Sequence, residues 1–286
     1  MGVIIDTPQL RMEIKFLSIK SLFTHEETIP KALEQLIQNL LDTQILQHPI
    51  IVDTDTNVVL DGMHRVAALK SLDCAIAPVC LVDYQNQAIE LFAWYREFDG
   101  DLPFHKLLEK ITFEGQYNTI KTSSIQAYEL VNTRSAMAAL AYGKTAFLLT
   151  PKSSLTIKEI YDKIAEIESI ARKIEYDIIY STEADALKSL QFEGHPVLIA
   201  PSLSKEEVVE SALQHKLFAH KTTRHIVPAR PLFTNVPLSW LKTTNLEEAS
   251  QQLYAHLNSK QIVKKDPGSI IDGRRYEECT YLFSNS

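Results

Sequence analysis

HPIIVDTDTNVVLDGMHRVAALKSLD, residues 48–73, is the stretch that decides the fold. Its run PIIVD predicts a buried strand, TDTN a turn, VVL a second strand, and residues 64–72 a helix with apolar side chains at helical spacing. A strand that passes through Gly62 into a helix leaves unpaired backbone amides where the helix begins. The stretch therefore predicts mixed α/β structure with a polar turn between strand and helix.

Apolar periodicity predicts further elements on both sides of this stretch. Residues 13–20 alternate like a strand, and a helix that Thr28 or Pro30 begins is expected over KALEQLIQNLLDTQIL. Residues 75–83 and 87–95 are expected to be strands. The polar segment FDGDLPFH, around residue 100, interrupts the pattern and predicts a domain boundary.

The second half alternates strands and helices again. Ser204 followed by Glu207 has the spacing of a capping box. The expected strands are 174–180 and 195–201, and the expected helices are 183–192, 204–215 and 245–257. Residues 266–286 are expected to be a terminal appendage. We predict an α+β protein with an N-terminal domain (1–100), a smaller α/β domain (101–240) and a helical C-terminal extension (241–286).

Composition narrows the class of protein. The chain has 286 residues, 45% of them hydrophobic, which is enough for two domains, and its formal charge is −7. Proteins that coat nucleic acid or anionic membranes are more often basic, so a DNA partner is not expected. No apolar run reaches the roughly 20 residues of a membrane span, and the three cysteines show no metal or disulfide spacing. We expect a cytoplasmic protein, either a monomer or a homodimer.

The turn Asp61-Gly62-Met63-His64-Arg65 is the most specific chemical signal. Amides at a helix N-terminus suit a phosphate group, and His64 and Arg65 add side-chain donors. Asp61 adds a carboxylate that can hold Mg²⁺ or accept a proton. The structural alternative is that Asp61 caps the helix and Arg65 pairs with an acidic neighbour.

Two other polar stretches are candidates. Thr24-His25-Glu26-Glu27 offers a general base, although paired carboxylates at this place often only complement a helix dipole. HKTTRHIVP, residues 220–228, concentrates cationic and hydroxyl side chains and favours an anion site over a simple basic helix end. Trp94 and Tyr95, taken alone, are more typical of a core. His48 is assigned no metal role, and Tyr84 is assigned no functional role.

In their order along the chain, these motifs resemble the ParB/sulfiredoxin-like superfamily and, within it, the free L-serine kinases of the SerK and SbnI types. The resemblance covers about residues 13–240, and KTTRH is its most discriminating motif because it lies outside the shared ParB-like domain. It implies an N-terminal nucleotide-binding domain, a C-terminal domain and an active-site cleft between them.

The resemblance also implies roles for individual residues. The catalytic candidates are Glu26 and Asp61, and Asp61 is also the candidate Mg²⁺ ligand. The candidates for the nucleotide and its phosphates are Gly62, Met63, His64, Arg65, Thr222, Thr223 and, by a loose correspondence, Asn39. The candidates for the amino-acid substrate are Trp94, Lys221, Arg224 and His225.

Departures from the family pattern refine this expectation. Met63 replaces the first histidine of the archaeal D-G-H-H-R, which favours ATP over ADP as donor, and it also lacks the reactive thiol of sulfiredoxins. The implied reaction converts L-serine and ATP, with Mg²⁺, into O-phospho-L-serine for siderophore or cysteine synthesis. The alternatives are a ParB-like DNA-binding regulator and a nucleotide sensor without catalysis.

Overall fold

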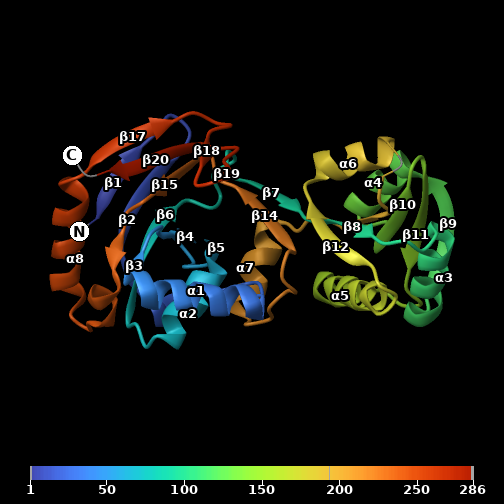
Figure 1. Ribbon diagram of the computed structural model, residues 1–286, viewed down its shortest axis with the longest axis horizontal. Coiled ribbons are helices and arrows are strands. Elements are labelled where there is room, and N and C mark those ends of the chain that lie inside the picture. Colours follow the sequence, from blue (N-terminus) through green and yellow to red (C-terminus); the bar gives the residue numbers. More distant parts are fainter. Residues whose placement is uncertain (1, 193, 285–286) are drawn as a thin grey trace. The chain divides into compact units, whose positions relative to one another are not determined.

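The strand, turn, strand and helix expected in residues 48–73 form in the computed structural model, which describes residues 2–192 and 194–284. Strand β4 is Ile50–Asp53, β5 is Val59–Asp61 and helix α2 is Met63–Ser71. All residues of β4 are buried. The α+β class is confirmed, since helices and mostly antiparallel sheets make up the chain (Figure 1).

The chain divides into two compact units. Unit 1 contains the described residues up to Glu90, the segment Val208–His220 and the described residues from His225 onward. Unit 2 contains Leu91–Glu207 and Lys221–Arg224. This division differs from the boundaries predicted at residues 100 and 240, since it places the change of unit at Glu90 and assigns the described residues from His225 onward to unit 1, where Val236–Pro237 pairs with Ile45–Leu46.

Unit 1 is built on a five-stranded mixed sheet in the order β1-β2-β6-β4-β5. Strand β6 is parallel to β4 and antiparallel to β2, and it is buried along its whole length. Helices α1 and α2 pack on each other, and α8 packs on β1 and β2. The remaining elements of the first part of this unit are β1 (Val3–Asp6), β2 (Arg11–Ser18), the 3₁₀ helix Ile19–Ser21, α1 (Pro30–Thr43), β3 (Ile45–Leu46) and β6 (Ile76–Val82).

The C-terminal part of unit 1 adds a three-stranded sheet in the order β15-β20-β17. Buried Phe283 and Thr280 on β20 show that this segment belongs to a core and is not the appendage expected from the sequence. Its elements are β15 (Ala229–Leu232), β16 (Val236–Pro237), the 3₁₀ helix Leu238–Lys242, α8 (Leu246–Asn258), β17 (Gln261–Lys265), β18 (Ile270–Ile271), β19 (Arg274–Arg275) and β20 (Cys279–Ser284).

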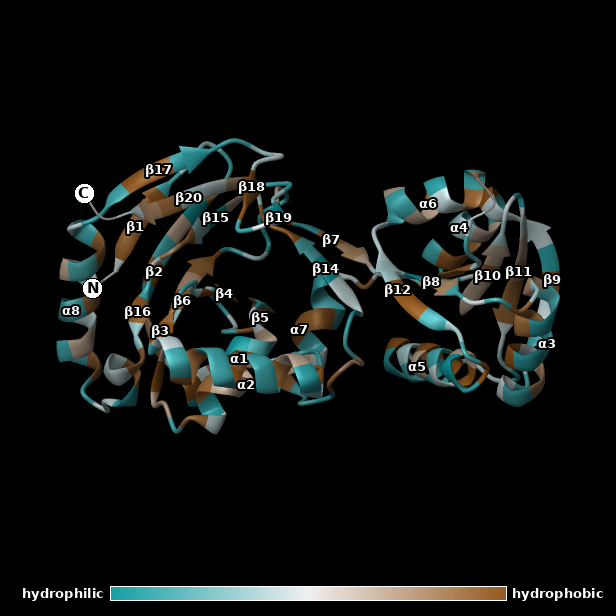
Figure 2. Cartoon of the chain, in the orientation of Figure 1, coloured by the Kyte–Doolittle hydropathy of each residue, from teal (hydrophilic) through white to brown (hydrophobic). Residues whose placement is uncertain are grey.

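Unit 2 is a six-stranded antiparallel sheet in the order β12-β8-β13-β10-β11-β9. Helices α4 and α6 pack on this sheet, and α3 packs on α5. Its elements are β8 (Tyr95–Asp99), α3 (Phe104–Gly115), β9 (Asn118–Ser123), α4 (Ser124–Asn132), β10 (Ala138–Tyr142), β11 (Thr145–Thr150), α5 (Ile157–Lys173), β12 (Asp177–Ser181), α6 (Glu183–Gln191) and β13 (Val197–Ile199). Hydrophobic residues concentrate on the strands, whereas the helices alternate hydrophobic and hydrophilic residues (Figure 2).

The chain passes from one unit to the other at four points; one lies between His220 and Lys221, and the other three lie within secondary-structure elements. Strands β7 (Glu90–Ala93) and β14 (Thr223–Ile226) form a two-stranded sheet, and α7 (Lys205–Leu213) is the third element. The capping box predicted for α7 is confirmed, since Glu207 N–H donates to Ser204 Oγ over 3.1 Å and Ser204 N–H donates to the Glu207 carboxylate over 2.8 Å.

Candidate active site

The turn after β5 depends on a glycine. Gly62 is the N-cap of α2 and has a φ of 116°, a conformation that side chains on an L-residue disfavour. A Cβ at this position would lie 3.0 Å from Nε of Arg65. Gly62 therefore allows the Arg65 side chain to fold back over the turn toward Asp61.

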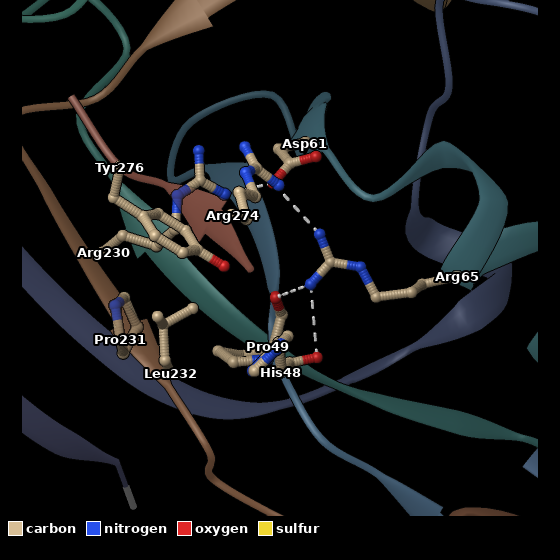
Figure 3. Close-up of a pocket in the computed structure, with 9 residues that line it drawn as sticks. All are labelled: His48, Pro49, Asp61, Arg65, Arg230, Pro231, Leu232, Arg274 and Tyr276. Atoms are coloured by element: carbon tan, nitrogen blue, oxygen red, sulfur yellow. Dashed lines mark hydrogen bonds and ion pairs between the residues drawn. The ribbon is translucent and has the colours of Figure 1, made fainter. Parts of the chain in front are cut away.

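Asp61 lies between two arginines. Its Oδ2 is 3.1 Å from Nη2 of Arg65 and also pairs with Nη1 of Arg230, a residue of β15 far away in the sequence (Figure 3). Burial acts to raise the pKa of Asp61, but the charges of Arg230 and Arg65 outweigh it and hold the pKa well below its ordinary value. Arg230 in turn donates from Nε to Glu278 over 2.6 Å. Asp61 is therefore a permanently charged carboxylate.

Most polar groups of the 61–65 turn already have protein partners. Nη1 of Arg65 donates to the carbonyl oxygens of His48 and Pro49, and Nε2 of His64 accepts a hydrogen bond of 2.9 Å from the amide of Ile29. No side-chain cap from Asp61 is present at the start of α2. The structural alternative was that Arg65 pairs with an acidic neighbour and Asp61 caps α2; the pairing is found and the capping is not. Phosphate binding by this turn remains a prediction.

A small, partly open pocket with a cavity volume of about 30 Å³ lies beside Asp61. His48 lines it and accepts from the amide of Phe233 at Nδ1 over 3.1 Å. Burial, Arg65 and Arg230 lower the pKa of His48 to about 4, so the ring is neutral at pH 7 and carries its proton on Nε2. The pocket is lined by His48, Pro49, Asp61, Arg65, Arg230, Pro231, Leu232, Arg274 and Tyr276 (Figure 3).

Glu26 lies beside a buried, neutral histidine. Backbone bonds tie this segment to Phe218, whose amide donates to the His25 carbonyl over 2.8 Å. The Glu26 carboxylate is 4.0 Å from Nε2 of His25, and 12% of its side chain is exposed. Burial lowers the pKa of His25 to about 4, so at pH 7 this ring does not neutralise the Glu26 charge.

The same cluster includes Tyr84, to which the sequence assigned no role. The Tyr84 hydroxyl is 2.8 Å from Nε2 of His225, and the His225 ring packs edge-on against His25 with centroids 5.6 Å apart. Asp53 anchors Tyr84 by accepting its amide at 3.0 Å. Glu26 and His225, which are 199 positions apart by their numbers, are thus brought to the same place through His25.

In unit 2, cationic residues of the KTTRH motif lie over aromatic rings. Nζ of Lys221 is 4.5 Å from the centroid of the Trp94 ring, and the Arg224 guanidinium is 5.9 Å from the same ring and 5.2 Å from Phe92. Trp94 separates β7 from β8, so the ring is held at a break between strands. The structure thus brings Trp94, Lys221 and Arg224 together.

The other predicted residues differ in accessibility. Thr222 and Thr223 are buried, at 0% and 8% exposure, and the Thr222 carbonyl accepts from the Tyr161 hydroxyl. Asn39 is exposed on α1, and Met63 is the first residue of α2.

Sequence patterns gave no signal for Arg230, because it occupies a short strand whose four residues are all buried.

A charged carboxylate lies between guanidinium groups at a strand–helix turn, and a second acidic residue lies in a buried histidine cluster, so the class is a mixed α/β protein with two candidate polar sites. No protein-family model matches the chain. It is 32% identical to the ATP-dependent L-serine kinase of Staphylothermus marinus, over 84% of this chain and 98% of that protein. The chain therefore belongs to the L-serine kinase family.

Other relatives agree with this assignment. The ADP-dependent L-serine kinase SerK of Thermococcus kodakarensis is 27% identical over 82% of this chain and 96% of its own. A solved free serine kinase mutant in complex with ADP is 25% identical with a TM-score of 0.67, covering 80% of this chain and 93% of that one. C-terminally truncated SbnI from Staphylococcus aureus shares the fold, with a TM-score of 0.69 at 18% identity, over 86% of this chain and 95% of that one.

Two further observations bear on ligands and location. Within residues 2–192 and 194–284, no cluster of three or more His, Cys, Asp or Glu side chains is suited to hold a metal ion. In the same residues, no helix has the length and apolarity needed to cross a membrane.

Proposed function

We propose that the protein transfers the terminal phosphoryl group of ATP to the hydroxyl of free L-serine and so forms O-phospho-L-serine. The observation that carries this proposal is the 32% identity to an ATP-dependent L-serine kinase over almost the whole of that protein. Met63, at the place where the archaeal ADP-dependent pattern has histidine, supports ATP as the preferred donor. The cytoplasm, which supplies both ATP and free serine, is the proposed location.

Glu26 is the proposed group that orients or deprotonates the serine hydroxyl. A general base needs a pKa near the working pH, and Asp61 is held far below that range by Arg230 and Arg65. Glu26 is a partly exposed carboxylate whose oxygen lies 4.0 Å from Nε2 of a neutral histidine, so no positive charge of that ring lowers its basicity. Asp61 then acts by fixing the two arginines, whose positive charges stabilise phosphate oxygens.

The substrate carboxylate and ammonium groups are proposed to meet Trp94, Lys221, Arg224 and His225. Arginine offers a carboxylate a planar pair of donors, and the proposal is supported by the Lys221 and Arg224 cations, which lie 4.5 Å and 5.9 Å from the centroid of the Trp94 ring. Gly62, His64 and Arg65 are proposed near the nucleotide phosphates because they lie at the start of α2, where amides and the helix dipole favour anions. Thr222, Thr223 and Asn39 are weaker candidates for such contacts.

The residues at this site suit a Mg²⁺ ion that binds together with the nucleotide better than one held by the protein alone. Asp61 is the only carboxylate that lines the described pocket, and two guanidinium groups already occupy its Oδ2. Mg²⁺ commonly uses one or two carboxylates together with substrate phosphates. Asp61 would be its protein ligand, and the ion would supply charge neutralisation on the phosphate oxygens.

The test is incubation of the purified protein with L-serine and either ATP or ADP, followed by mass spectrometry for phosphoserine. We expect phosphoserine with ATP and, in equal amount, ADP; donation from ADP would produce AMP. L-threonine and D-serine measure the tolerance for the acceptor. Nucleotide hydrolysis without phosphoserine, or no reaction with either donor, would contradict the proposal.

A further inference from the structure

The pocket beside Asp61 carries a surplus of positive charge. Three guanidinium groups line it, and the two nearby carboxylates, Asp61 and Glu278, are both bonded to Arg230. Arg65 is bonded to Asp61 as well. In the described part of the chain, by contrast, Arg274 has no carboxylate within 4.0 Å and its side chain is exposed, so its charge is available to a ligand.

Arg274 lies on a hairpin in the segment that the resemblance did not cover. Strands β18 and β19 pair through a two-residue turn, Asp272-Gly273, in which both residues have positive φ values (47° and 77°). This is the turn chemistry that matches the twist of a hairpin. Beyond the strands, Gly268 N–H donates to the Tyr276 carbonyl over 2.7 Å and Tyr276 N–H donates to the Ser269 carbonyl over 3.0 Å.

Alternation along this segment directs two side chains into the pocket. Residues two apart point to the same face of an extended chain, and both Arg274 and Tyr276 line the pocket whereas Arg275 does not. The guanidinium of Arg274 lies 4.8 Å from the centroid of the buried Tyr276 ring. Figure 3 shows the Tyr276 hydroxyl pointing into the pocket, where no hydrogen bond to another described residue holds it.

The pocket wall opposite the hairpin adds a neutral donor. His48 uses Nδ1 as an acceptor for the Phe233 amide, so its proton is on Nε2. Donors therefore outnumber acceptors: His48, Arg274 and Tyr276 can each donate, and Oδ2 of Asp61 already pairs with two arginines. A pocket of this composition suits an oxyanion with several acceptor oxygens.

We propose that this pocket binds a phosphate group and that the C-terminal hairpin contributes Arg274 and Tyr276 as binding residues. This phosphate-site proposal rests on the proposed function only where it names the nucleotide donor as one possible source of the phosphate group. The phosphate group is either part of the nucleotide donor or a free inorganic phosphate, and both would use the same side chains.

The experiment compares the full-length protein with Arg274→Gln, with Tyr276→Phe and with the control Arg275→Gln. Arg275 is the neighbouring arginine on the same strand, is exposed and lies outside the pocket. Binding of ATP, ADP and inorganic phosphate is measured by calorimetry, and KM and kcat are measured for ATP and for serine. Loss of one charge-assisted hydrogen bond predicts roughly a tenfold weaker affinity for Arg274→Gln, a smaller loss for Tyr276→Phe and no change for Arg275→Gln.

Each outcome separates the two proposals. Weaker binding of ATP and ADP with an unchanged KM for serine identifies the nucleotide as the source of the phosphate group. If Arg274→Gln weakens the binding of inorganic phosphate but not that of ATP or ADP, the pocket is a phosphate site separate from the nucleotide site. Unchanged affinity for all three ligands in Arg274→Gln overturns the inference even if phosphoserine is formed, whereas Arg274-dependent phosphate binding without phosphoserine formation overturns the proposed function alone.

Discussion

At the scale of single residues, the two candidate carboxylates differ in their surroundings. Asp61 is tied to Arg65 and Arg230, whose charges hold its pKa well below its ordinary value, so it is ionised at neutral pH. Glu26 sits beside His25, which burial keeps neutral. Both residues were candidates in the sequence, but the separate roles proposed for them rest on the charges that the fold places next to each.

Glu26→Gln is expected to lower kcat for phosphoserine formation by about 100-fold or more, the range typical of a lost general base. Nucleotide affinity should stay within about twofold of the wild type, because Glu26 does not line the pocket that holds Arg65. The matched control is Glu27→Gln, an exposed carboxylate one position further along. Full activity in Glu26→Gln would remove this residue from the mechanism.

The buried histidine predicts a sensitivity to acid. The pKa of His25 is about 4 in the folded protein against 6.5 in the unfolded chain, so below pH 6.5 the unfolded state binds a proton first. The stability present above pH 6.5 is then lost as the pH falls toward 4, by at most about 3 kcal/mol for this residue. Thermal melts of the wild type and His25→Gln between pH 7.5 and 4.5 measure this, and an equal slope in both would refute it.

At the scale of elements, periodicity predicted most strands and helices around the site but missed where strands end. Residues 87–95 were expected to be one strand, yet the structure has β7 and β8 in different sheets with Trp94 between them. The alternation of apolar and polar residues continues through such a break, because it depends on which side chains are buried. It does not show which strand each segment hydrogen-bonds to. The break is what places the Trp94 ring beside Lys221.

The β5–α2 junction gives a prediction at this scale. Gly62→Ala would force a side chain into a backbone with a φ of 116° and against Arg65, and should cost about 1–3 kcal/mol of unfolding free energy. It should also lower activity, because Arg65 loses its position over the turn. Ala67→Gly in the same helix is the control, with a loss of about 1 kcal/mol from helix propensity alone. Equal loss of activity in both variants would show that the turn has no special role.

At the scale of the whole molecule, the C-terminal segment is part of unit 1. Strand β20 lies between β15 and β17, and Glu278 just before it bonds Arg230. The sequence suggested an appendage because strands that pair with distant segments show no local signal. The last part of the chain thus stabilises the residue that holds Asp61.

Phe283→Ala tests this arrangement. Phe283 is 2% exposed on β20, so its truncation should lower the free energy of unfolding by about 3–5 kcal/mol. The control is Ile262→Ala on β17, which pairs with Phe283 in register but is 44% exposed and should cost less than about 1 kcal/mol. Chemical denaturation followed by fluorescence or circular dichroism measures both, and an unchanged midpoint for Phe283→Ala would mean that the segment is an appendage.

The sequence by itself determined the α+β class, the strand–turn–helix at residues 48–73 and the candidate motifs, because these depend on local periodicity, on glycine and on the order of short motifs. Only the tertiary structure decided that Arg230 and Arg274 reach Asp61's pocket and that Tyr84 reaches His225. Such contacts join strands and loops far apart in the chain. The free energy of these contacts comes from burial and from charge interactions between segments that are distant in sequence. A local sequence pattern therefore does not predict them.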